Sequence, residues 1–206
     1  DATLAAFVEH FASRFGAHLL AVLAYGSYLR GKRDTVLDFY VVVDSYSALP
    51  RLAGLANRLL PPNVYHVTLG SGDARQAAKF ATVTLEHFKH SIETDFHCYF
   101  WARFAQPFVV LFARDESLRR QIEQLGLAAA RRVLASSLAA LPETFDSETA
   151  WRHAFTLSYG AELRAEDAAG AARLVEHYGE TLNAHLEALA SEFNLTPVAP
   201  RRWRHT

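Results

Sequence analysis

Two aspartates and a Gly-Ser pair lie close together in the stretch "AVLAYGSYLRGKRDTVLDFYVVVD", residues 21–44. Gly26 and Ser27 end an apolar run. A turn at that point can hold phosphate oxygens, because its backbone N–H groups converge without a side chain in the way. Asp38 and Asp44 belong to the next apolar run, where a carboxylate could bind a divalent cation. The residue types therefore predict a phosphate site with Mg²⁺ beside it.

The spacing of the two aspartates separates their roles. In a strand their side chains point to the same face, but six residues place them roughly 20 Å apart, too far for one metal unless the chain bends. Asp38, eleven residues after Ser27, is the better metal ligand, and Asp44 could instead end the strand. A purely structural role for Asp38 stays open, as a loop cap or as the partner of a basic residue in the loop, Arg30, Lys32 or Arg33.

Hydrophobic periodicity predicts the elements that must position these residues. In the N-terminal half it predicts a helix over 3–15, strands over 18–27, 35–44 and 63–69, and a helix over 49–60 that ends at the prolines. A short apolar run over 108–113 follows Pro107. The run at 79–88 begins as a strand and passes into a helix near Thr84. One helix is predicted over 86–105, with apolar residues facing inward: Phe88, Ile92, Phe96, Tyr99 or Phe100, and Phe104. Residues 116–193 have helical periodicity, broken around Pro142 and Gly160.

This order of elements predicts an α+β protein, with a mixed sheet in residues 1–114 and a helical domain in 115–206. The formal net charge is -1, which argues against nucleic acid as a partner because phosphate binding on that scale requires a basic face. The single cysteine, Cys98, excludes an internal disulfide and zinc sites built on cysteine pairs. The ten histidines lack the spacing of a zinc hydrolase, and we expect them to be solvated or hydrogen-bonded. The oligomeric state stays open.

Gly-Ser followed after about ten residues by an aspartate resembles the nucleotidyltransferases of the polymerase-β type. The longer string "YGS…LDFYVVVD" resembles the mitochondrial-type CDP-diacylglycerol synthases, the mitochondrial translocator assembly and maintenance family, whose motifs run Y-G-S and L-D-F with a following V-D. Three further stretches resemble that family in the same order: "NVYHV", "KFATVTLEHFKHSIETDFHCYFWARFAQPFVVL" and "LPETFDSETAWRHAFTLSYGAELR". The resemblance covers roughly residues 20–180.

The resemblance implies a nucleotidyltransferase fold and the reaction of CTP with phosphatidate to give CDP-diacylglycerol and pyrophosphate, with Mg²⁺. Gly26 and Ser27 would meet the triphosphate, and Asp38 would hold the metal. Asp44 would be the family's second carboxylate. Lys79 and Arg103 would neutralise phosphate charge. Three residues of the helical half would complete the site: Tyr159 and Arg164 at the nucleotide, and Glu162 as a further metal ligand.

The sequence departs from the family pattern at several positions. Tyr28 follows the Gly-Ser pair where the family has glycine, and it could narrow the turn. Ala102 stands where the family has glycine, Gln106 replaces a lysine, and Glu162 replaces an aspartate. Tyr40 departs instead from the general polymerase-β pattern, which has a second carboxylate two positions after the first. Two alternatives therefore stay open. The acceptor could be soluble rather than phosphatidate, or the chain could be a nucleotide-binding module without catalysis.

A lipid acceptor requires access to a bilayer, and the sequence has no apolar run of the roughly 20 residues that span one. Contact with a membrane would be peripheral. We expect a cytoplasmic protein, at the inner face of the cytoplasmic membrane if attached, or on the matrix side of the inner membrane if mitochondrial. The tail "PVAPRRWRHT" combines three arginines with Trp203, which suits an anionic interface, and it equally suits a disordered soluble tail.

Overall fold

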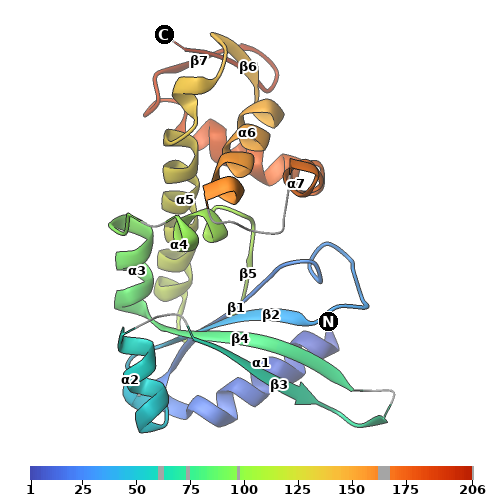
Figure 1. Cartoon of the computed structure of the whole chain (residues 1–206), viewed down its shortest axis with the longest axis vertical. Coiled ribbons are helices and arrows are strands. Elements are labelled where there is room, and N and C mark those ends of the chain that lie inside the picture. Colours follow the sequence, from blue (N-terminus) through green and yellow to red (C-terminus); the bar gives the residue numbers. More distant parts are fainter. Residues whose placement is uncertain (60–62, 73–74, 97, 162–167, 206) are drawn as a thin grey trace. The chain divides into compact units, whose positions relative to one another are not determined.

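The computed structural model describes residues 1–59, 63–72, 75–96, 98–161 and 168–205 (Figure 1). The chain divides into two compact units. The first consists of Asp1–His90 and Phe108–Glu123, and the second consists of Ser91–Pro107 and Gln124–Thr206. Each unit is therefore built from two separate segments of the chain.

The first unit contains a five-stranded mixed sheet in the order β3-β4-β2-β1-β5. Its strands are β1 (Leu19–Tyr25), β2 (Leu37–Val43), β3 (Val64–Leu69), β4 (Gln76–Thr84) and β5 (Val109–Ala113). Strands β2 and β4 are parallel, and the other neighbours are antiparallel. The prediction of an α+β fold with a mixed sheet is confirmed.

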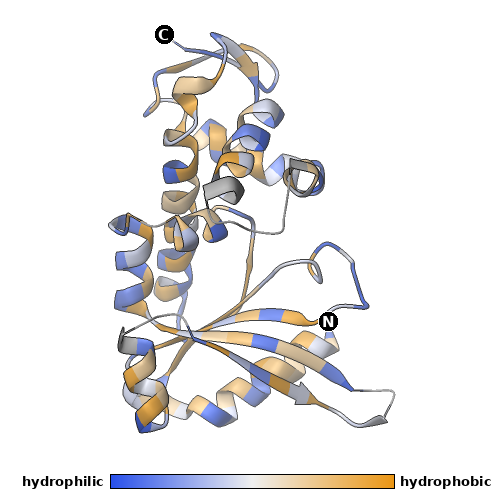
Figure 2. Ribbon diagram, viewed as in Figure 1, coloured by the Kyte–Doolittle hydropathy of each residue, from blue (hydrophilic) through white to orange (hydrophobic). Residues whose placement is uncertain are grey.

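Helix α1 (Ala2–Phe15) packs against one face of this sheet through three buried phenylalanines, Phe7, Phe11 and Phe15. The ring centroid of Phe11 lies 5.5 Å from that of Phe39 on β2 and 5.0 Å from that of Phe80 on β4. Asp1 caps the helix, since its carboxylate accepts a hydrogen bond from the Thr3 amide. The strands are mostly hydrophobic along their length (Figure 2), as expected of a sheet covered on this face by a helix.

Short helices connect the strands. They are η1 (Gly16–His18), η2 (Tyr46–Ala48), α2 (Arg51–Leu59) and α3 (Leu85–Glu93), and the long helix α5 (Glu116–Ala135) begins in this unit. Helix α3 follows β4 directly at Thr84, as predicted. Asp115 caps α5 by accepting a hydrogen bond from the Leu118 amide at 2.8 Å.

The second unit consists mainly of helices. It contains α4 (Tyr99–Phe104), most of α5, η4 (Leu138–Ala140), α6 (Ser147–Ala161) and α7 (Ala168–Leu189). Helices α6 and α7 pack together around Trp151, which is fully buried and donates from its indole nitrogen to the Leu182 carbonyl at 2.7 Å. A three-stranded antiparallel sheet of β6 (Thr144–Asp146), β8 (Arg202–His205) and β7 (Leu195–Ala199) completes the unit. No described helix has the length and apolar character that crossing a bilayer requires.

The prediction of one helix over 86–105 is wrong. Helix α3 ends at Glu93 and α4 begins at Tyr99, and Phe96 between them is 93% exposed rather than inward. The Arg132 guanidinium donates to the carbonyls of Ile92 at 2.8 Å and Asp95 at 2.7 Å, which satisfies acceptors at the end of α3. This long-range contact ends the helix, and periodicity cannot reveal it. Phe100 and Phe104 are buried as predicted.

The C-terminal tail is folded rather than disordered. Strands β7 and β8 form a hairpin, and Trp203 of β8 pairs with Phe145 of β6. Trp203 is only 7% exposed, and its indole nitrogen donates to the Ser147 hydroxyl at 3.3 Å. The tryptophan that suggested an interfacial anchor in the sequence is therefore part of the core of the second unit.

We expect Phe11→Ala to lower the free energy of unfolding by about 3–5 kcal/mol, because the ring is fully buried against two other phenylalanines. Phe96→Ala is the matched control and should change it by less than about 0.5 kcal/mol, since that ring is exposed. Denaturant unfolding followed by circular dichroism measures both. Equal losses in the two variants would contradict the assigned core.

Acid should destabilise the second unit through His185. Burial lowers the pKa of His185 from its ordinary value of 6.5. Just below pH 6.5 the unfolded chain binds a proton at this position and the folded chain does not, so the free energy of unfolding falls as the pH drops. We expect His185→Gln to reduce the difference in unfolding free energy between pH 7.5 and pH 5.5. The exposed His177, changed to Gln on the same helix, is the control; an equal reduction in both variants would refute the assignment.

Candidate functional site

Four polar side chains form a row across the sheet of the first unit. Tyr25 on β1 is paired with Asp38 on β2, Asp38 with Lys79 on β4, and Lys79 with His66 on β3. Side chains at paired positions of neighbouring strands lie on the same face, so the row brings a phenol, a carboxylate, an ammonium and an imidazole side by side.

The row lies on the sheet face opposite α1. The residues next to it along the strands, Phe39, Phe80 and Tyr65, belong to the core on the α1 side. Because side chains alternate along a strand, the polar row must point the other way. Asp38 is the half-buried member of a strand whose other residues are all buried. The strand sequence "LDFYVVV" thus supplies a rigid, mostly apolar frame with one carboxylate at its beginning.

Asp38 and Lys79 form an ion pair, with 3.4 Å between Oδ1 and Nζ. The side chains are 21% and 45% exposed, so solvent screens the pair and its contribution to stability is at most about 1 kcal/mol. Asp38 thus has an ion-pair partner, as its structural alternative predicted, but Lys79 belongs to the neighbouring strand and not to the loop. Rearranging a pair of such small value around a charged ligand would cost little free energy.

Gly26 lies directly against the Asp38 carboxylate. Its φ of +89° is in the region that favours glycine, and a Cβ at this position would lie 2.7 Å from Asp38 Oδ2. The missing side chain therefore lets one carboxylate oxygen approach the Gly26 backbone while the other oxygen faces Lys79. The structure brings together three of the predicted site residues: Gly26, Asp38 and Lys79.

The loop after Gly26 is held by side chains at both of its ends. Ser27 Oγ lies 3.0 Å from Thr35 Oγ1, which ties the beginning of the loop to its end. Tyr28 is 8% exposed, and its hydroxyl donates to Asp1 Oδ2 at 2.9 Å. The Arg33 guanidinium lies 4.6 Å from the Tyr28 ring centroid. Since Tyr28 is buried in the core and bonded to the start of α1, its ring does not narrow the turn at Ser27.

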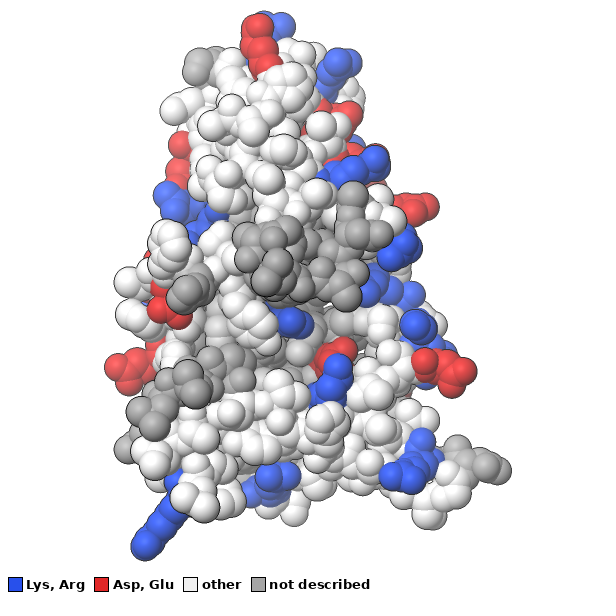
Figure 3. Space-filling view, viewed as in Figure 1, with Lys and Arg blue, Asp and Glu red and all other residues white. Residues whose placement is uncertain are grey.

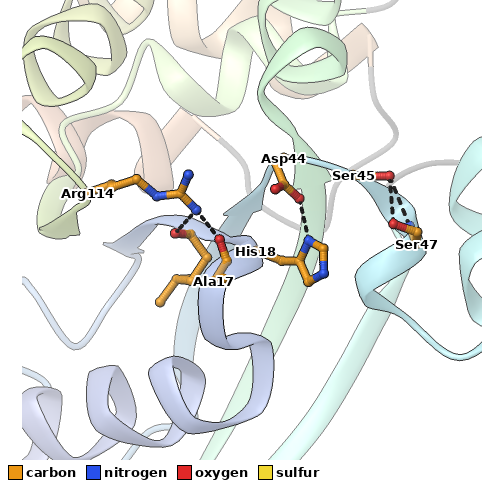
Figure 4. A network of polar contacts seen from close by, with 7 residues as sticks. Ala17, His18, Asp44, Ser45, Ser47 and Arg114 are labelled. Atoms are coloured by element: carbon orange, nitrogen blue, oxygen red, sulfur yellow. Dashed lines mark hydrogen bonds and ion pairs between the residues drawn. The ribbon is translucent and has the colours of Figure 1, made fainter.

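Asp44 lies at the opposite end of β2 (Figure 4). Its Oδ1 is 2.9 Å from His18 Nδ1, and both side chains are about half exposed. Nearby, Arg114 donates to the backbone carbonyls of Ala17 and Leu19. Strand β2 pairs with β4 residue by residue from Leu37 to Val43, so no bend brings Asp44 toward Asp38. The structure does not bring the two predicted carboxylates together.

The remaining predicted residues belong to the second unit or lie outside the described residues. Arg103 is on α4, with its guanidinium 5.2 Å from the Tyr99 ring centroid. Tyr159 is in α6. Glu162 and Arg164 lie outside the described residues. A site that combines residues of both units stays a prediction of the sequence.

Sequence reasoning missed three residues around Asp38. Tyr25 and His66 join the row only because strand pairing places them beside Asp38 and Lys79, and Thr35 meets Ser27 across the loop. The alternation in "NVYHVTL" could have placed His66 on the face opposite Tyr65, but strand order was needed to put it next to Lys79. Within the described residues, no group of three or more His, Cys, Asp and Glu side chains could hold a metal ion.

The chain was compared with protein families, curated proteins and solved structures. No protein-family model matches the chain, and no curated protein matches it. Among solved structures, a nucleotidyltransferase-like protein from Exiguobacterium sibiricum 255-15 aligns with a TM-score of 0.37 and 10% identity, over 91% of this chain and 58% of that one. This chain thus spans less than two thirds of the matched protein's length, and a similarity this low supports no functional conclusion. None of these comparisons supports the CDP-diacylglycerol synthase family specifically.

The two glycines of this loop with positive φ offer a matched test of the site. Gly31→Ala meets no atom within 4 Å at φ +85°, so it should cost only the left-handed backbone, about 1 kcal/mol of unfolding free energy. Gly26→Ala adds the contact with Asp38 Oδ2 and should cost about 1–3 kcal/mol more. Denaturant unfolding measures the difference. Identical losses would show that Asp38 does not lie against Gly26.

Proposed function

We propose that the protein is a nucleotidyltransferase that transfers a cytidylyl group from CTP to phosphatidate, giving CDP-diacylglycerol and pyrophosphate. The observation that supports this most is the contact of the Asp38 carboxylate with the glycine of the Gly-Ser turn, beside Lys79. A carboxylate, a turn without a side chain and a cation within one small area are the groups that a nucleoside triphosphate and its metal need. CTP and phosphatidate are proposed as the substrates because the sequence motifs resemble those of the CDP-diacylglycerol synthases and occur in the same order.

The donor set fits Mg²⁺ in one specific way. Mg²⁺ is usually held by one or two carboxylates together with substrate phosphates and water, rather than by a cage of protein ligands. Asp38 would be the protein ligand, with its Oδ2 atom against the backbone of the Gly-Ser turn and its Oδ1 atom 3.4 Å from Lys79 Nζ. When bound, the metal would neutralise charge on the attacked phosphoryl group and on the leaving pyrophosphate.

The residues of the first unit would hold the triphosphate in position and neutralise its charge. The turn at Gly26 and Ser27 would hold the triphosphate, and the Ser27–Thr35 contact would keep that turn in place. Lys79, 3.4 Å from Asp38, would neutralise phosphate charge beside the metal ligand. Arg30 and Lys32 in the same loop add positive charge at its exposed end.

The reaction needs no general base. An oxygen of the phosphatidate phosphate forms a bond with the α-phosphorus of CTP, and the bond from that phosphorus to the bridging oxygen breaks, so the electron pair leaves with pyrophosphate. A phosphate monoester has its second pKa near 6, so the attacking oxygen already carries a negative charge at pH 7. One carboxylate for the metal is then sufficient. From the second unit, Arg103, Tyr159, Glu162 and Arg164 would contribute as the sequence motifs imply.

A second candidate is a nucleotide-binding module that does not catalyse transfer. It is favoured by the single carboxylate of the polar row and by the separation of Asp44 from Asp38. Such a module would bind a triphosphate with Mg²⁺ and would release no pyrophosphate. A soluble acceptor in place of phosphatidate is the remaining alternative.

Asp38→Asn keeps the shape of the side chain and removes its charge, so we expect the rate of pyrophosphate release from CTP and phosphatidate to fall by about a hundredfold or more. Glu9→Gln is the matched control, because it removes one negative charge from the exposed face of α1, on the other side of the sheet. A coupled pyrophosphate assay with Mg²⁺ measures both variants. Full activity of Asp38→Asn would refute the assignment.

Thermal-shift measurements separate the alternatives. A ligand that binds only the folded protein raises its melting temperature, so the four nucleoside triphosphates, each with and without Mg²⁺, report nucleotide and metal together. A CTP-selective, Mg²⁺-dependent shift with pyrophosphate release supports the proposal. The same shift without release of pyrophosphate on any acceptor supports the nucleotide-binding module. Release of pyrophosphate with a soluble acceptor alone supports an enzyme that uses a soluble acceptor in place of phosphatidate.

A further inference from the structure

Helix α2 (Arg51–Leu59) presents two leucines, Leu52 and Leu55, to solvent. Leu52 is 84% exposed and Leu55 is 55% exposed, and their spacing of three residues places them on one side of the helix. Soluble domains expose single large apolar residues at random, but two neighbouring leucines on one short helix form a continuous apolar ridge. We call Leu52 and Leu55 the leucine ridge.

On the opposite side of α2, polar and small residues hold the helix in place. Asn57 is fully buried, and its amide nitrogen donates to the Ala53 carbonyl at 2.9 Å and to the Tyr65 hydroxyl at 2.7 Å. Its Oδ1 accepts from the Asn63 amide at 3.2 Å. At Gly54 a Cβ would lie 2.8 Å from the Tyr46 carbonyl oxygen, so the helix approaches η2 closely. The usual arrangement is inverted: the polar and small side chains face the protein and the leucine ridge faces outward.

The segment that contains the leucine ridge carries no negative side chain. The chain contains 22 Asp and Glu residues, yet none occurs between Asp44 and Asp73, the segment that includes η2, α2 and β3. Arg51, at the start of α2, is exposed beside Leu52. Where Figure 1 labels α2, the atoms of Figure 3 that are not grey are white or blue.

We propose that the leucine ridge and Arg51 form a docking surface for an anionic lipid bilayer. Leucines can enter the boundary between headgroups and acyl chains, while arginines remain at the level of the lipid phosphates. A second copy of the chain fits less well, because two such surfaces would place arginine against arginine without any carboxylate in the segment. Nucleic acid would use Arg51 but not the exposed leucines.

This surface also replaces the anchor that the sequence suggested. Trp203 is buried beneath Ser147 and unavailable to a membrane, whereas the leucine ridge is exposed in the folded protein. The inference does not depend on the proposed reaction, because it rests on the leucine ridge and Arg51 rather than on Asp38.

Vesicle flotation tests the proposal. We expect the intact protein to float with vesicles of phosphatidylcholine containing phosphatidylglycerol, to bind vesicles of phosphatidylcholine alone at least about tenfold more weakly, and to dissociate as salt is raised. Phosphatidylglycerol is used instead of phosphatidate so that binding of a substrate does not count. Leu52→Glu combined with Leu55→Glu should lower the bound fraction at least about tenfold, and Arg51→Glu should lower it for the anionic vesicles.

Val198→Glu is the matched control, because Val198 is an exposed apolar residue of β7 in the other unit and its replacement should leave flotation unchanged. Thermal unfolding shows whether each variant is folded. The proposal is overturned if the folded double variant binds anionic vesicles as well as the wild type, or if the wild type does not bind them. It is also overturned if the wild type is a dimer that the double variant converts to monomers. Transfer to a short-chain, soluble phosphatidate reports the proposed reaction separately, since it needs no bilayer.

Discussion

The close approach of the Gly26 backbone to the Asp38 carboxylate is the constraint on which the candidate site depends. Strand pairing places the end of β1 beside the beginning of β2, and only a residue without a Cβ leaves the carboxylate room there. The same glycine turns the chain at φ +89° into the loop that carries Ser27. Glycine therefore provides both the turn and the room that the Asp38 carboxylate occupies.

The two faces of the sheet have different roles: one stabilises the fold, and the other carries the polar row. On the face toward α1, phenylalanines from three elements pack into one core, and their burial fixes the register of β2 and β4. A shift of one residue would expose Phe39 and Phe80 and bury Asp38 and Lys79 in their place, which is strongly unfavourable. The apolar face thus specifies where the polar row lies, although the row itself contributes little to stability.

The sequence predicted most elements and the central pair Gly26 and Asp38, because local periodicity and turn chemistry determine them. It could not place His66, whose position beside Lys79 depends on strand order. It also failed for Phe96, since a distant arginine ends the preceding helix, and for Trp203, which a composition argument assigned to a tail. In each case the missing information is a contact between residues far apart in the chain.

Helix α2 shows how the same reasoning extends from stability to interaction. Its attachment relies on a buried asparagine with three hydrogen bonds and on a glycine against a carbonyl, so the exposed Leu52 and Leu55 are not needed to hold the fold. Exposed leucines lower solubility without adding stability. Their presence beside Arg51, in a segment without any carboxylate, has a physical explanation if the surface meets an apolar and anionic partner, and a bilayer is both.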